Sequence, residues 1–147
     1  MKILFFVSSF PALSETFILN QITGMIDRGH EVEILATKRV RTVHHPEVEK
    51  YDLMNKVKYI EIPRNPLLKI FKGFVNFNKV FIKHPKRAYT LINRKEHGNF
   101  VWNLRPLYLY PFFEENKGYD VIIAHYGYNL LLLGHQSINL CNRILVH

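Results

Sequence analysis

The order of apolar and polar positions in the first 36 residues predicts a strand, a helix and a second strand. Residues 3–7 form an uninterrupted apolar run, which is typical of a parallel strand covered on both faces. Apolar residues then recur at helical spacing, as Ile18, Leu19, Ile22, Met25 and Ile26. Arg28 and Gly29 suit a helix end, and Val32 begins the next strand. Residues 2–36 are therefore expected to be one βαβ unit with a right-handed crossover.

A polar loop joins the first strand to this helix. Ser14 suits the N-cap because its hydroxyl can accept hydrogen bonds from the first-turn amides, and Glu15 places a negative charge at the positive end of the helix dipole. Thr16 follows in the first turn. Ligands of parallel sheets bind where a strand's carboxyl end meets a helix N-terminus. These three residues are candidates for substrate binding, and capping alone is the alternative.

The next part of the chain predicts shorter elements. Residues 37–45 carry several basic side chains and are expected to form a loop. Pro46 suits the first position of a short helix that continues to about Asn55. Residues 57–62 alternate apolar and polar positions and end at a proline, which indicates a third strand near the sheet edge.

Residues 64–95 are expected to be a basic amphipathic helical segment. Asn65 and Pro66 suit a helix N-cap and first position. The helix would have a wide apolar face formed by Leu67, Ile70, Phe71, Phe74, Phe77, Val80 and Phe81. Lys69, Lys72, Lys79 and Lys83 recur at spacings of three or four on the opposite face. After the interruption at His84, a second short helix is expected over residues 86–94.

The last third of the chain returns to a pattern of helix and buried strand. The aromatic residues 101–113 predict one or two helices packed on the sheet, and residues 119–125 predict another buried strand. A helix rich in leucine is expected over residues 130–140, followed by a strand from residue 144. Because a domain rarely stops within a core strand, we expect the chain to be the front part of a longer polypeptide.

These elements predict an α/β fold, a Rossmann-like three-layer domain with a mostly parallel sheet spanning residues 1–147. The hydrophobic content of 48% supports a folded core. The single cysteine, Cys141, cannot form an internal disulfide, so a cytoplasmic protein is expected. No apolar run is long enough to suggest a transmembrane helix.

The net charge of +8 comes from one segment. Residues 64–95 contain nine Lys or Arg side chains and no Asp or Glu. The simplest interpretation is a solvated lysine face on a helix packed against the core. The alternative is an interfacial helix whose lysines, Lys69, Lys72, Lys79 and Lys83, face an anionic membrane. Nucleic acid is disfavoured as a partner, because the aromatic residues lie on the face away from the lysines.

Several kinds of site have no motif in this sequence. There is no Asp-x-Asp, no Gly-x-Gly-x-x-Gly after the first strand, no Walker sequence and no serine nucleophile elbow. His44 and His45 point apart in an extended chain, and no Cys/His or carboxylate cluster has ligand spacing. No metal site and no cofactor are therefore expected.

Three motifs together resemble the N-terminal domain of family 4 glycosyltransferases, closest to the branch that builds bacterial exopolysaccharides such as colanic acid. They are Phe-Pro-x-x-Ser-Glu-Thr-Phe-Ile from Phe10, Arg-Gly-His-Glu-Val from Arg28, and Asp-Val-Ile-x-x-His from Asp120. One departure is that no glycine precedes Gly24, whereas many relatives have a glycine-rich first loop. The resemblance covers residues 1–36 and 119–147, and the middle is less diagnostic.

The resemblance implies the N-terminal half of a GT-B enzyme with two Rossmann-like domains facing a cleft. In this family the N-terminal domain holds the acceptor, and the C-terminal domain, which lies outside this chain, holds the nucleotide-sugar. His125 would act near the transferred sugar, and Ser14, Glu15, Thr16, Tyr126 and Gly127 would bind substrate. His30, at the opposite sheet edge, is interpreted as structural.

The leading hypothesis is the acceptor-binding half of a retaining, metal-independent glycosyltransferase, peripheral on the inner face of the plasma membrane. It would transfer a sugar from a nucleotide-sugar to a lipid-linked saccharide in bacterial polysaccharide biosynthesis, and the 147 residues alone are expected to be inactive. The alternative is a non-catalytic Rossmann-like module that binds an anionic membrane or polyanion. A third alternative, a small nucleotide-binding regulator, would need a complete sheet within these residues. The interrupted last strand argues against it.

Overall fold

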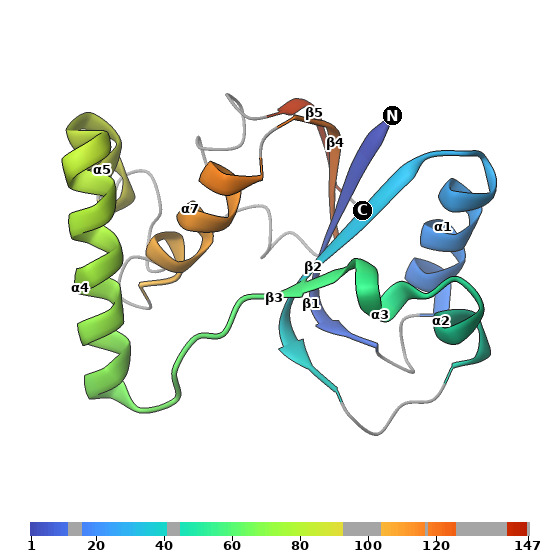
Figure 1. The fold of residues 1–147 in the computed structure, drawn as a ribbon, viewed down its shortest axis with the longest axis horizontal. Helices are drawn as coiled ribbons and strands as arrows, with labels where there is room; N and C mark the ends of the chain where they lie inside the picture. Colours follow the sequence, from blue (N-terminus) through green and yellow to red (C-terminus); the bar gives the residue numbers. More distant parts are fainter. Residues whose placement is uncertain (12–15, 41–44, 93–103, 117, 126–140, 147) are drawn as a thin grey trace.

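The computed structural model describes residues 1–11, 16–40, 45–92, 104–116, 118–125 and 141–146, and these form layers of helices around a parallel sheet (Figure 1). The five strands lie in the order β3-β2-β1-β4-β5, and every neighbouring pair is parallel. Their bounds are β1 Lys2–Phe10, β2 Glu31–Arg39, β3 Val57–Tyr59, β4 Tyr119–Ala124 and β5 Cys141–Val146. The predicted Rossmann-like α/β fold class is confirmed.

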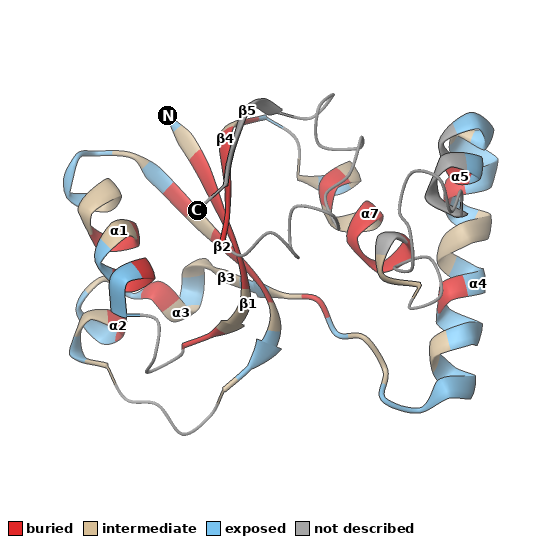
Figure 2. Cartoon of the chain, turned by 180° about the vertical axis from the view of Figure 1, so that it is seen from behind, coloured by how far each residue is buried: buried red, intermediate tan, exposed pale blue. Residues whose placement is uncertain are grey.

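The helices cover both faces of the sheet. One face packs against α1 Thr16–Asp27, α2 Pro46–Lys50 and α3 Leu53–Lys56, and the other against α7 Arg105–Glu115. Helices α4 Pro66–Lys83 and α5 Pro85–Ile92 pack on α7 and lie farther from the sheet (Figure 1). The burial colouring shows the difference: the central strands β1 and β4 are mostly buried, whereas much of α4 is exposed (Figure 2).

The predicted βαβ unit is present, with its helix and both strands. Gly29 ends the turn after α1 with a φ of 78°, and its amide donates to the Ile26 carbonyl at 2.8 Å. Only glycine adopts this left-handed backbone without a steric cost. The turn sets the register in which Lys2 pairs with Glu31.

The continuous apolar run of β1 is explained by burial on both faces. Phe5 packs in the core under α1, while Leu4 and Phe6 pack in the core under α7. All three are fully buried. Successive side chains of a strand point to opposite faces, so a central strand covered twice needs apolar residues at every position.

Two predictions between the second strand and residue 62 need correction. The expected loop at residues 37–45 is wrong for its first part, because β2 continues to Arg39, where Thr37 Oγ1 donates to the Ser8 carbonyl at 2.7 Å. The single helix expected from Pro46 is two helices, because Asp52 takes a left-handed conformation with a φ of 50°. β3 is shorter than predicted and lies at the sheet edge as expected.

The basic segment and the later elements largely follow the predicted pattern. Asn65 Oδ1 accepts from the Leu67 amide at 2.9 Å, which confirms the predicted cap of α4. Helix α5, α7 and strand β4 lie within or close to the predicted ranges. β5 begins three residues earlier than predicted. The helix expected over residues 130–140 lies outside the described residues.

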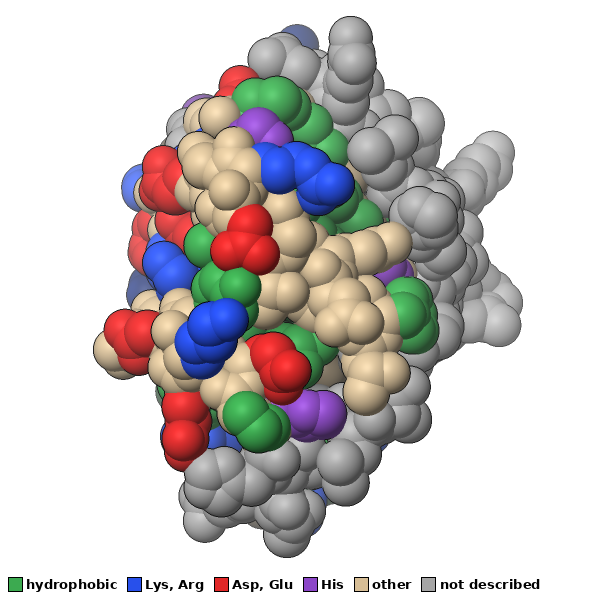
Figure 3. Space-filling view, turned by 90° about the vertical axis from the view of Figure 1, so that its right-hand side faces the viewer, with side chains coloured by type: hydrophobic (Ala, Val, Ile, Leu, Met, Phe, Trp, Pro, Cys, Tyr) green, Lys and Arg blue, Asp and Glu red, His purple; other side chains and the backbone are tan. Residues whose placement is uncertain are grey.

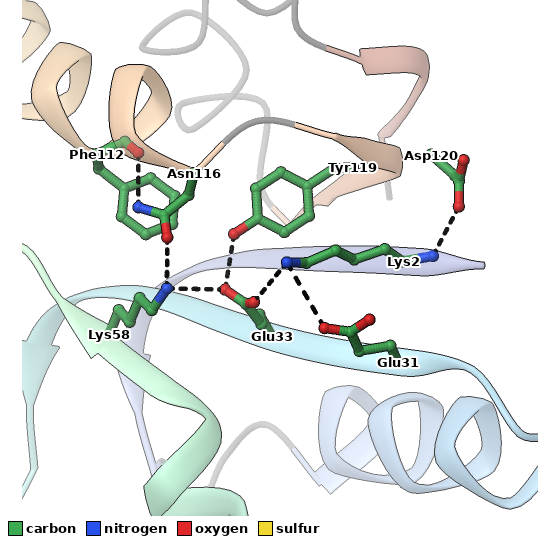
Figure 4. A network of polar contacts seen from close by, with 8 residues as sticks. All are labelled: Lys2, Glu31, Glu33, Lys58, Phe112, Asn116, Tyr119 and Asp120. Atoms are coloured by element: carbon green, nitrogen blue, oxygen red, sulfur yellow. Dashed lines mark hydrogen bonds and ion pairs between the residues drawn. The ribbon is translucent and has the colours of Figure 1, made fainter.

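A polar network joins β1, β2, β3 and β4 near the amino-terminal edge of the sheet (Figure 4). Glu33 of β2 is held by Lys2 Nζ at 2.9 Å, by Lys58 Nζ at 3.1 Å and by the Tyr119 hydroxyl, which donates at 2.7 Å. Burial raises the pKa of Glu33, but the hydrogen bonds from Tyr119, Lys2 and Lys58 outweigh it and lower the pKa to about 2. The ionised carboxylate of Glu33 therefore stabilises the fold.

We expect Glu33→Gln to destabilise the protein by about 2 kcal/mol at pH 7, because the amide removes the negative charge that pairs with both Lys2 and Lys58. The pKa of Glu33 is lower in the folded state than the unperturbed value of 4.5. Its contribution is therefore present above that value and is lost as the pH falls toward 2. Urea unfolding at several pH values measures this difference. Glu31→Gln is the matched control, since Glu31 is exposed and its ion pair with Lys2 is longer, at 3.6 Å. Equal losses in both variants would contradict the assignment.

Candidate functional site

The carboxyl ends of the strands meet at one edge of the sheet, because all five strands are parallel. This edge carries Phe10 at the end of β1, Arg39 at the end of β2 and His125 directly after β4. Open α/β sheets bind their ligands at this edge. Two features of the described structure lie here: the His125 ring, and a basic cavity at the ends of β2 and β3.

His125 lies beneath the start of α1. Its amide donates to the Phe6 carbonyl at 3.2 Å, which extends the pairing of β4 with β1. Its ring stacks on Phe5 with centroids 6.0 Å apart and meets the edge of Phe17 at 5.6 Å. Only 1% of the residue is exposed. The strand end and the helix N-terminus thus lie side by side, as predicted. Because the His125 ring is buried, contact with a substrate would require the residues that cover it to move.

The other residues predicted for this site are only partly described. Thr16 is the first residue of α1 and is exposed, and the adjacent Phe17 touches the His125 ring. Ser14, Glu15, Tyr126 and Gly127 lie outside the described residues. His30 lies in the turn between α1 and β2, at the opposite edge from His125, where its amide donates to the Met25 carbonyl at 3.1 Å.

A cavity of about 690 Å³ lies where β2 and β3 end, between the sheet and the first turns of α4. Six of its lining residues are basic and one, Glu61, is acidic. The basic residues are Lys38, Arg39, Arg64, Lys69, Lys72 and Arg105. We call this cavity the basic pocket. The sequence prediction missed it, although the run of basic residues at the expected loop after β2 was a signal.

Contacts between neighbouring strands hold the side of the basic pocket that lies at the sheet edge. The Arg39 guanidinium lies over the Tyr59 ring, 5.7 Å from its centroid, and the Tyr59 hydroxyl donates to the Phe10 carbonyl at 3.1 Å. Burial raises the pKa of Tyr59, and the nearby Arg39 lowers it by less. Tyr59 therefore stays a neutral hydrogen-bond donor near neutral pH. The three strand ends β1, β2 and β3 are joined through this tyrosine.

Helix α4 exposes most of its apolar side chains, unlike a helix packed against the core. Its buried residues are Gly73 and Val80, with Phe77 partly buried against α7 and α5. The Tyr108 hydroxyl of α7 also donates to the Lys69 carbonyl at 2.7 Å. The exposed apolar residues are Leu67, Leu68, Ile70, Phe71, Phe74, Val75, Phe81 and Ile82. We call this surface the α4 apolar face.

The lysines of α4 lie apart from its apolar residues, as the sequence predicted. At roughly 100° per residue, the lysines form a stripe between the α4 apolar face and the side packed on α7. Lys72, Lys79 and Lys83 are exposed, and Lys69 is half-buried. By contrast, acidic and basic side chains are interspersed on the surface around α1 and α2 (Figure 3). The α4 surface therefore combines exposed apolar area with charge of one sign.

Neither a membrane span nor a metal cluster is found in the part of the chain that the structure describes. None of the described helices is long and apolar enough to cross a bilayer. Within the same residues, no three His, Cys, Asp or Glu side chains gather in a way that could hold a metal ion.

The chain is similar to glycosyltransferases of bacterial polysaccharide biosynthesis. It is 35% identical over 130 residues to the colanic acid biosynthesis glycosyltransferase WcaL of Salmonella typhimurium and 35% identical over 129 residues to WcaL of Escherichia coli. It is also 44% identical over 61 residues to the amylovoran biosynthesis glycosyltransferase AmsK of Erwinia amylovora. No family model and no solved structure matches the chain.

The matches cover unequal shares of the proteins. Each WcaL match includes 86% of this chain and 31% of the relative, and the AmsK match includes 41% of this chain and 15% of the relative. The chain thus spans about a third of the length of the WcaL proteins.

Proposed function

We propose that this chain is the acceptor-binding domain of a GT-B glycosyltransferase of family 4 that acts in bacterial polysaccharide biosynthesis. The observation that carries the proposal is the similarity to WcaL over 86% of this chain, on a Rossmann-like parallel sheet. The fold alone would not support it, since such sheets host many unrelated activities. The donor, a nucleotide-sugar, would bind mainly to a second domain of the longer enzyme.

The proposed reaction takes place at the carboxyl edge of the sheet. The N-terminus of α1 and the end of β4 lie together there: Thr16 is the first residue of α1, and His125 directly follows β4. His125 would donate a hydrogen bond to the transferred sugar, which stabilises charge that develops in the transition state. Ser14, Glu15, Tyr126 and Gly127 would complete the acceptor side of the cleft.

The reaction would be metal-independent and would retain the anomeric configuration of the donor sugar. Without a metal, the leaving diphosphate needs stabilisation from fixed dipoles and cationic side chains. The proposed enzyme would obtain this stabilisation across the interdomain cleft, in part from the second domain.

We also propose that the domain works on an anionic membrane, as a peripheral protein of the inner face of the plasma membrane. The α4 apolar face supports this location, since exposed apolar patches of this kind mark interaction surfaces. Lys69, Lys72, Lys79 and Lys83 border that face, and no acidic residue lies between 64 and 95. This charge favours anionic lipid as the partner. A lipid-linked saccharide would then be the acceptor.

The reaction class is tested by incubating the full-length protein with labelled nucleotide-sugars and membranes that contain lipid-linked saccharides. We expect label in the saccharide with an unchanged rate in EDTA, and an NMR spectrum of the product showing the anomeric configuration of the donor. Loss of activity in EDTA would contradict the metal-independent mechanism, and inversion would contradict retention. Binding to membranes without transfer from any nucleotide-sugar would instead support the non-catalytic module.

A further inference from the structure

The basic pocket is a separate feature from the His125 ring, although both lie at the carboxyl edge of the sheet. It is formed by the ends of β2 and β3 and by residues at the starts of α4 and α7. Its volume of about 690 Å³ falls in the range of small-molecule sites. The pocket therefore has the size and the position of a binding site.

The charge of the pocket selects the class of ligand. Six cationic side chains and one carboxylate line it, so the pocket has a strong excess of positive charge. Arg64 directly precedes Asn65, the N-cap of α4, and Arg105 is the first residue of α7. The positive ends of two helix dipoles therefore lie beside the pocket. Arginine forks and lysine ammonium groups together suit the oxygens of phosphate groups. A diphosphate carries enough charge to contact several of these residues at once.

The surroundings of the pocket indicate where the diphosphate comes from. Lys69 and Lys72 line the pocket and also belong to the lysine stripe along the α4 apolar face. A helix that lies at the membrane surface keeps its cationic side chains at the level of the lipid headgroups. The pocket is thus next to the surface proposed to contact lipid. A phosphate group bound there could remain attached to a lipid chain in the bilayer.

We propose that the basic pocket binds the diphosphate of a polyprenyl-diphosphate-linked acceptor, while the α4 apolar face contacts the surrounding lipid. This inference rests on the proposed function, because it names the anchor of the same acceptor. The diphosphate would fix the acceptor at β2 and β3, and its sugar would extend along the sheet edge toward His125.

The test compares two kinds of phosphatidylcholine vesicle with equal surface charge. One contains undecaprenyl diphosphate and the other contains phosphatidylglycerol. We expect the protein to bind the diphosphate vesicles about tenfold more tightly. Lys69→Gln/Lys72→Gln should remove this preference. Lys79→Gln/Lys83→Gln is the matched control on the same helix, since it removes the same charge outside the basic pocket and should retain the preference.

Competition by soluble ligands shows whether the pocket binds the diphosphate of a lipid or that of a nucleotide. Inorganic pyrophosphate should compete with the diphosphate vesicles at least as well as uridine diphosphate does. Stronger competition by uridine diphosphate would assign the pocket to the nucleotide and overturn the proposal. Equal binding of the protein to both kinds of vesicle would also overturn the proposal. So would an equal loss of the preference in the two double variants, when circular dichroism shows that both are folded. These binding results do not depend on sugar transfer, so a failure of the proposed reaction is detected separately.

Discussion

The variant His125→Phe is expected to lower kcat of the full-length protein by about a hundredfold or more. Phenylalanine keeps a flat ring between Phe5 and Phe17, whereas it removes both ring nitrogens. Loss of one hydrogen bond that stabilises a developing charge costs about this much in related chemistry. The measurement is the initial rate of label transfer at saturating donor, together with the thermal unfolding temperature.

His30→Phe is the matched control for this experiment. His30 lies in the turn before β2, at the sheet edge opposite His125. The same substitution should leave kcat unchanged there. The role assigned to His125 would be wrong if His125→Phe kept the wild-type rate, and a purely structural role would be indicated by parallel losses of rate and thermal stability.

Replacement of Lys69, Lys72, Lys79 and Lys83 by glutamine is expected to abolish most binding to anionic vesicles. Each basic residue near such a surface contributes about 1 kcal/mol, so four changes weaken binding by roughly a thousandfold at low salt. Sedimentation with vesicles that contain phosphatidylglycerol measures this effect. Binding by the wild type should also fall as salt is added, because the attraction is screened.

Two further variants separate charge from apolar contact. Lys50→Gln/Lys56→Gln changes basic residues of α2 and α3, on the other side of the sheet, and should leave vesicle binding nearly unchanged. Phe71→Asn/Phe74→Asn keeps every lysine but removes two exposed aromatic rings of α4, and should weaken binding with little change in its salt dependence. Absence of vesicle binding by the wild type would contradict the membrane role of α4. It would indicate that another partner covers this surface.

Local sequence signals predicted the framework of the fold well. The apolar runs at the centre of the sheet identified β1 and β4, because strands buried on both faces need such runs. Gly29 and Asn65 were predicted as helix boundaries, since each is explained by backbone geometry within a few residues. The break at Asp52 was not predicted, because a single left-handed aspartate leaves no clear pattern around it.

The features near the candidate site depend on contacts between distant segments. Helical periodicity predicted the apolar residues of α4, yet it could not show that they are exposed, because exposure depends on what packs on the helix. The basic pocket joins Arg39 of β2 to Arg105 of α7, and no spacing in the sequence relates them. The position of His125 at a strand end was predictable, whereas its cover by Phe17 was not.

The most direct test of the central claim is the destination of the labelled sugar. The full-length protein is incubated with a labelled nucleotide-sugar and with equal amounts of two acceptors, a lipid-linked saccharide in vesicles and the same saccharide released into water. The proposed function predicts that label enters the lipid-linked saccharide and is extracted with the lipid. Label in neither acceptor, or in the released saccharide alone, would contradict a glycosyltransferase that takes its acceptor from the membrane.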